Sequence, residues 1–192
     1  MCTCDVQVKH THVGGINNNK KTVFDQLEQL GINIPHEDRF YPYRSTFDYE
    51  SYFDKSDLPD AGEKLVWVMR HVLCSVSVCS NVANFEQSKC FINTSPQRLV
   101  HDKMQYLETI ADAAFEILKE NFQYVFDQLE PENKQHQAVK GRFASYLQEH
   151  IVISFNSSSY DIPLVKAHLL EYLRDKIKFV ILKGKSFMCP PN

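Results

Sequence analysis

Residues 45–53 read STFDYESYF, and this stretch decides the fold because its side-chain pattern repeats every two residues. Thr, Phe and Tyr favour extended backbone, so the stretch predicts a strand. Asp48 and Glu50 occupy alternate positions of that strand, which places both carboxylates on one face, about 7 Å apart along the backbone. Like charges at this spacing repel unless a cation lies between them. The pair is therefore a candidate metal site, with two ordinary acidic residues on a solvated face as the alternative.

The flanking sequence predicts an α/β fold with a mixed sheet flanked by helices. Residues 1–22 mix Cys, His, Gly and Asn and predict a disordered or loosely attached lead-in to a domain that spans 23–192. A short helix at 23–30 should end at Gly31. Apolar periodicity then predicts strands from His71 and at 90–93, a long helix at 96–129, a helix at 133–148, a buried strand at 151–155, a helix at 163–176 and a last strand at 178–182.

A second polar cluster follows the predicted buried strand, where residues 151–161 read IVISFNSSSYD. The strand runs into a turn of small residues that presents Asn156, Tyr160 and Asp161 just before a helix. Three serines let the backbone approach a ligand closely. Taken by itself, this segment is better explained by a capped turn in which Asn156 and Asp161 bond the local backbone.

Composition narrows the classes of protein that fit this chain. Its 192 residues carry a formal net charge of −3, so no global basic field attracts nucleic acid, and any DNA contact should be local. The opening stretch lacks an apolar segment and six cysteines lack a secretory context, which predicts an intracellular protein, nuclear or cytoplasmic, that is not secreted and does not contact a membrane. Cys2, Cys4, His10 and His12 are spaced more tightly than usual zinc ligands, which favours a loose terminus over a zinc site.

The two polar segments together resemble the first two exonuclease motifs of family-B DNA polymerases. The first motif of that family is D-x-E on a strand, here Asp48-Tyr49-Glu50, and the second is N-x(2–3)-F/Y-D, here NSSSYD at 156–161. The flanks FYPYRSTFDYESYF (40–53) and VISFNSSSYDIPLVKAHL (152–169) are similar to the protein-primed viral and organellar branch, especially the polymerases of large self-replicating eukaryotic transposons. The likeness covers about residues 25–190.

This resemblance implies most of the 3′→5′ proofreading exonuclease domain of a DNA-directed DNA polymerase, with a ribonuclease-H-like fold. Asp48, Glu50 and Asp161 would be the catalytic carboxylates and the ligands of two Mg²⁺ or Mn²⁺ ions, which activate a water and stabilise the leaving 3′ oxygen. Ser51, Asn156 and Tyr160 would bind a single-stranded DNA 3′ end. The remainder of the polymerase would be a further partner.

The sequence also departs from that family. No Y-x(3)-D motif follows Asp161 to supply the last catalytic carboxylate, and the polymerase palm is not found. We therefore expect a fragment that does not copy DNA by itself. The alternatives are a non-catalytic remnant with the same fold and at most weak binding of single-stranded DNA, or a separate ribonuclease-H-like nuclease.

Overall fold

The computed structural model of the chain describes residues 21–55, 68–154, 160–175, 181–183 and 186–188. Residues 1–20 of the predicted lead-in at 1–22 lie outside these residues. The described chain forms two compact units. One combines the residues up to Tyr41 with Lys119–Leu147, and the other combines Pro42–Leu118 with the residues from Gln148 onward. The unit that begins at Pro42 contains both candidate motifs and the main sheet.

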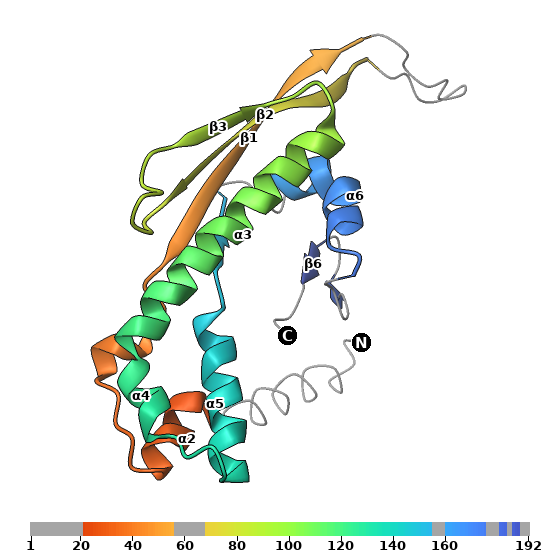
Figure 1. Cartoon of the computed structure of the whole chain (residues 1–192). Coiled ribbons are helices and arrows are strands. Elements are labelled where there is room, and N and C mark those ends of the chain that lie inside the picture. Colours follow the sequence, from red (N-terminus) through yellow and green to blue (C-terminus); the bar gives the residue numbers. More distant parts are fainter. Residues whose placement is uncertain (1–20, 56–67, 155–159, 176–180, 184–185, 189–192) are drawn as a thin grey trace, which may run out of the picture. The chain divides into compact units, whose positions relative to one another are not determined.

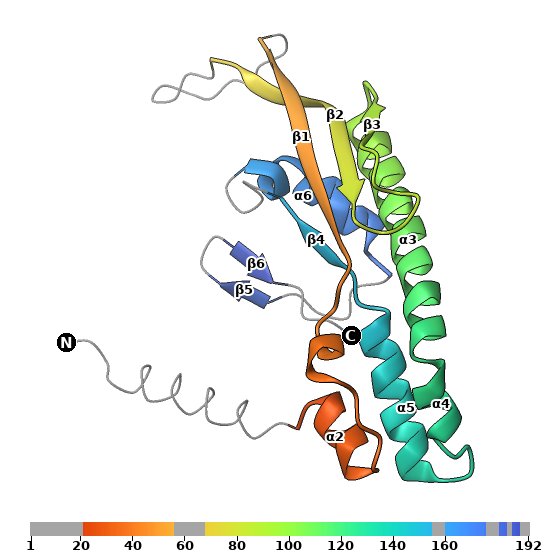
Figure 2. The same ribbon diagram turned by 90° about the vertical axis from the view of Figure 1, so that its left-hand side faces the viewer.

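The main sheet has four strands in the order β3-β2-β1-β4. Strand β1 (Arg44–Asp54) pairs antiparallel with β2 (Arg70–Ser80), which pairs antiparallel with β3 (Lys89–Ile92). Strand β4 (Ile151–Ile153) joins the other edge of β1 in the parallel direction (Figure 2). The predicted α/β class with a mixed sheet is therefore confirmed.

The core of this unit lies between the sheet and two helices. Helix α3 (Pro96–Asn121) runs across one face of the sheet in Figure 1, and α6 (Ile162–Tyr172) adds Val165 to the same core. Along β1, Phe47 and Tyr49 are buried and Asp48 and Glu50 are exposed, as the period of two predicted. Burial of these rings against α3 thus fixes which face of β1 presents the carboxylates.

Strand β4 corrects one expectation. Its apolar sequence predicted a buried strand, but Ile151, Val152 and Ile153 are 45%, 40% and 45% exposed. The strand pairs only with β1 and forms an edge of the described sheet. Its side chains are therefore covered by one neighbouring strand and not by two. An apolar run of this length does not distinguish a central strand from an edge strand.

The long predicted helix at 96–129 is wrong in one respect, because it is broken at Phe122. Helix α3 ends at Asn121, and a short helix α4 (Gln123–Gln128) begins after Phe122, whose backbone leaves the helical region at φ −103° and ψ 17°. The Phe122 ring packs edge-on against Phe143 of α5 (Lys134–Leu147), with 5.5 Å between ring centroids. This packing is a tertiary contact that helical periodicity does not reveal.

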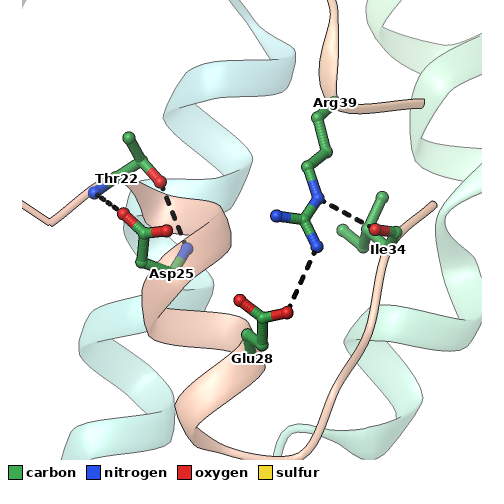
Figure 3. Close-up of polar contacts among 5 residues, drawn as sticks. All are labelled: Thr22, Asp25, Glu28, Ile34 and Arg39. Atoms are coloured by element: carbon green, nitrogen blue, oxygen red, sulfur yellow. Dashed lines mark hydrogen bonds and ion pairs between the residues drawn. The ribbon is translucent and has the colours of Figure 1, made fainter. Parts of the chain in front are cut away.

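The other unit begins with helix α2 (Val23–Gln29), whose first turn is closed by a capping box. The Thr22 hydroxyl accepts a bond from the Asp25 amide, and the Asp25 carboxylate accepts one from the Thr22 amide (Figure 3). The helix ends before Gly31, which adopts the positive φ of 80° that such an ending favours. The predicted helix and its end at glycine are confirmed.

Arg39 fastens the segment that follows α2. It lies in the 3-10 helix η1 (His36–Arg39), and its guanidinium donates to the Ile34 carbonyl and pairs with Glu28 of α2 (Figure 3). The same guanidinium lies 6.0 Å from the centroid of the Phe24 ring. The Arg39 side chain therefore links η1 to Glu28 and Phe24 of α2 and to Ile34 in the segment between the two helices.

A two-stranded antiparallel sheet completes the described chain, formed by β5 (Ile181–Lys183) and β6 (Ser186–Met188). The strand predicted at 178–182 overlaps β5, although 178–180 lie outside the described residues, and β6 was not predicted. Among the helices that the structure describes, none is both long and apolar enough to cross a membrane.

Replacing Phe143 should cost far more stability than replacing an exposed phenylalanine. Phe143 is fully buried and its ring contacts the rings of four other aromatic residues, Phe24, Phe122, Phe126 and Tyr146. We expect Phe143→Ala to lower the free energy of unfolding by about 3–5 kcal/mol and Phe40→Ala, at an exposed position, by less than about 1 kcal/mol. Urea denaturation followed by circular dichroism measures both, and equal losses would contradict this packing.

Candidate functional site

Asp48 and Glu50 project from the exposed face of β1, on the side away from α3. Opposite them, the register pairs Asp48 with Ser77 and Glu50 with Ser75 of β2, so two hydroxyl side chains flank the two carboxylates. The predicted pair on one face is thus present. Within the described residues, no three His, Cys, Asp or Glu side chains come together in a way that could hold a metal ion.

An open hollow of about 420 Å³ lies beside Asp48. Its wall includes Asp48 of β1, Ser77 of β2, and Ile153 and Ser154 at the end of β4. The hollow therefore joins the first motif to the strand that leads into the second. Ser154 is the residue through which the two are linked, because its hydroxyl also donates a hydrogen bond to Asp161.

Asp161 lies at the start of α6 and is only 1% exposed. Its charge acts on two buried side chains, Tyr49 and Lys103. Burial raises the pKa of the Tyr49 hydroxyl, and the Asp161 charge raises it further. The structure brings Asp48 and Glu50 together on the exposed face, whereas Asp161 is buried, so a three-carboxylate site stays a prediction.

Lys103 is a charged residue at this site that sequence reasoning missed. It is 3% exposed, and its Nζ atom lies 3.5 Å from the centroid of the Phe47 ring and 4.9 Å from that of Tyr49. Burial lowers the pKa of the Lys103 amine to about 8, against an opposing effect of the Asp161 charge. The signal was available, because Lys103 interrupts the apolar stripe of Leu99, Val100 and Leu107 on α3.

The residues predicted to bind a DNA end divide between the described and the undescribed chain. Ser51 and Tyr160 come together, with 2.5 Å between the Ser51 hydroxyl oxygen and the Tyr160 phenol oxygen. His71 Nδ1 completes a triangle, 3.0 Å from Ser51 and 3.3 Å from Tyr160. Asn156 lies outside the described residues.

A β-bulge explains why His71 joins this triangle. The register pairs Glu50 with Ser75 but Ser51 with Leu73, so Cys74 is an extra residue on β2. The alternation of β2 changes phase there: Val76 and Val78 face the core beyond the bulge, while Leu73 and His71 take that face before it. Bulges commonly redirect a side chain in this way. Sequence periodicity alone gave His71 no role.

No protein-family model, no curated protein and no solved structure matches this chain. The candidate site is therefore defined by the geometry of its own residues.

The buried amine of Lys103 should make stability depend on pH. In the unfolded chain its pKa is the ordinary 10.5, so between pH 8 and 10.5 the unfolded chain binds more protons than the folded chain. Stability must then rise with pH in that window, whereas below pH 8 the folded chain carries the full cost of a buried charge. We expect wild type to gain about 1–2 kcal/mol relative to Lys103→Met between pH 8 and about pH 9.5.

Urea denaturation at several pH values measures this difference. The range stops at about pH 9.5 because tyrosines of the unfolded chain begin to lose protons above it. Lys134→Met at an exposed position of α5 is the matched control, and it should track wild type at every pH. A constant difference between wild type and Lys103→Met would contradict the burial of the charged amine.

Proposed function

We propose that this chain carries most of the 3′→5′ exonuclease domain of a family-B DNA polymerase of the protein-primed type, with a ribonuclease-H-like fold. The observation that supports it best is the hydrogen bond between Ser51 and Tyr160. These residues lie 109 positions apart, directly after the first motif and within the second. Two motifs that define one nuclease site must lie close together, and this bond joins a residue next to the first motif to a residue of the second.

The sheet gives further support. Strand β4 lies parallel to β1 and beside it, so the segment that leaves β4 toward the second motif starts next to the first. The hollow beside Asp48 reaches Ser154, which bonds Asp161. A mixed sheet flanked by helices is compatible with a ribonuclease-H-like fold. The substrate would be the 3′ end of a DNA single strand.

The donor atoms of this site suit Mg²⁺ or Mn²⁺, which prefer carboxylate oxygens. Asp48 and Glu50 are exposed on one face and would hold the ion, while Asp161 would have to give up its bond to Ser154 to join them. The bound ions would supply charge stabilisation and an activated water. Asp48 and Glu50 could thus bind the ion as they stand, and Asp161 could bind it only after rearrangement.

One observation favours the alternative of a non-catalytic remnant. Asp161 is buried and takes a hydrogen bond from Ser154, and its charge acts on the buried Lys103 and Tyr49, which is the environment of a structural carboxylate. A chain with this arrangement would keep the surfaces that contact a DNA end without cleaving it. Binding and cleavage therefore have to be measured separately.

Nuclease activity should disappear when the exposed carboxylates are removed. We expect wild type with Mn²⁺ to shorten a 5′-labelled single-stranded oligonucleotide from its 3′ end, and the double variant Asp48→Ala, Glu50→Ala to lose at least about a hundredfold in rate, because both metal ligands are gone. Denaturing gel electrophoresis of the labelled products measures the rate and shows which end is shortened.

The matched control is Asp112→Ala with Glu120→Ala, which removes the same two residue types from exposed positions of α3. This variant should cleave as wild type does. Cleavage that survives in the Asp48, Glu50 variant would come from another site or a contaminant and would refute the proposed ligands. A folded wild type that binds the oligonucleotide without shortening it would support the non-catalytic remnant.

A further inference from the structure

Three aromatic side chains form a row at the end of the β1–β2 pair. Phe53 of β1 lies 4.6 Å from His71 of β2, and His71 lies 5.5 Å from Tyr160 before α6, measured between ring centroids. We call Phe53, His71 and Tyr160 the aromatic row. Phe53 is 61% exposed, His71 is exposed and Tyr160 is half-buried, so the row runs from the protein interior into solvent.

The row is held in position by contacts at its inner end. Ser51, His71 and Tyr160 are joined by three hydrogen bonds, and the bulge at Cys74 places His71 on the same face as Ser51. Phe53 lies opposite His71 in the strand register, which keeps the two rings together. A surface of rings whose orientation is set before a ligand arrives loses little entropy on binding.

The chemistry of the row fits nucleobases. Single-stranded nucleic acids bind to proteins by stacking bases on Phe, Tyr and His rings, and every base has a π-face that such rings accept. The row continues outward from Ser51 and Tyr160, the residues proposed to contact a DNA end. It would therefore receive the nucleotides next to that end.

We propose that the aromatic row is a base-stacking platform for single-stranded DNA, with Phe53 and His71 as binding residues. This inference rests on the proposed function, because it assigns the path of the same substrate beyond Tyr160. A strand of DNA with its 3′ end near Ser51 would place its last bases, counted back toward the 5′ end, on Tyr160, His71 and then Phe53.

The charge around the row indicates how such binding should respond to salt. The nearest cation in sequence, Arg70, pairs with Asp54 at 2.9 Å, and this pair occupies the strand positions that alternate with Phe53 and His71. Stacking, and not neutralisation of phosphates, should then dominate the affinity. We expect the dissociation constant to vary with salt as it does for about two phosphate contacts or fewer.

The test is binding of fluorescein-labelled oligo(dT) in EDTA, measured by fluorescence anisotropy with no divalent ion, so that cleavage does not intervene. Phe53→Ala and His71→Ala should each raise the dissociation constant between about fivefold and a hundredfold, the range for loss of one stacked base. Phe53→Leu should weaken binding as Phe53→Ala does, and Phe53→Trp should keep it, because Trp retains a π-face and Leu does not.

Tyr52→Ala is the matched control, since Tyr52 is 53% exposed on the opposite face of the same strand. It should change the dissociation constant less than twofold. The platform is refuted if wild type does not bind oligo(dT), if Phe53→Ala binds as wild type, if Tyr52→Ala loses as much, or if oligo(U) binds more tightly than oligo(dT).

The two proposals fail in different ways. Wild type that cleaves with Mn²⁺ while Phe53 and His71 variants bind as wild type refutes the platform and leaves the exonuclease standing. If the Phe53 and His71 variants lose binding and wild type does not cleave, the result supports the platform on a non-catalytic domain. Equal thermal unfolding midpoints for Phe53→Leu and Phe53→Trp show that the difference in binding does not come from misfolding.

Discussion

The packing of Phe47 and Tyr49 against α3 is the contact on which the rest of the larger unit depends. Side chains of a strand alternate, so burying these two rings forces Asp48 and Glu50 onto the exposed face. A shift of β1 by one residue would bury both carboxylates and expose both rings. The core therefore sets the position of the candidate site without any contact of its own to a substrate.

The bulge at Cys74 adds a second constraint, because it divides β1 into two parts with different neighbours on β2. Up to Glu50, the exposed face carries carboxylates opposite serines. From Ser51 onward, the face shared with Tyr49 passes from core to surface and carries Ser51, His71 and Phe53. Without the extra residue, Val72 and not His71 would take this face. One irregularity in the ladder thus brings an imidazole to the hydroxyl groups of both motif segments.

Local pattern predicted most of the elements, and the failures have a common cause. The alternation in 45–53 and the stripe in α3 depend on neighbours along the chain, so they could be read from the sequence. The break at Phe122, the exposure of β4 and the role of His71 each depend on a partner distant in sequence: Phe143, an edge of the sheet, and Ser51. For the site, the sequence predicted the shared face of Asp48 and Glu50, and the family resemblance grouped Ser51 with Tyr160 as contacts of one DNA end, but neither predicted the burial of Asp161.

The burial of Asp161 sets a condition on any catalytic role for it. Lys103 is a buried amine that lies over the rings of Phe47 and Tyr49, and the Asp161 charge favours its protonated form. Moving the Asp161 charge away would leave the buried Lys103 charge less compensated, which costs free energy. Rotation of Asp161 toward Asp48 would incur this cost and break its bond to Ser154. A ligand that recruits Asp161 must therefore bind the rearranged site more tightly by at least this margin, or Lys103 must first lose its proton, which its lowered pKa of about 8 makes accessible at mildly alkaline pH.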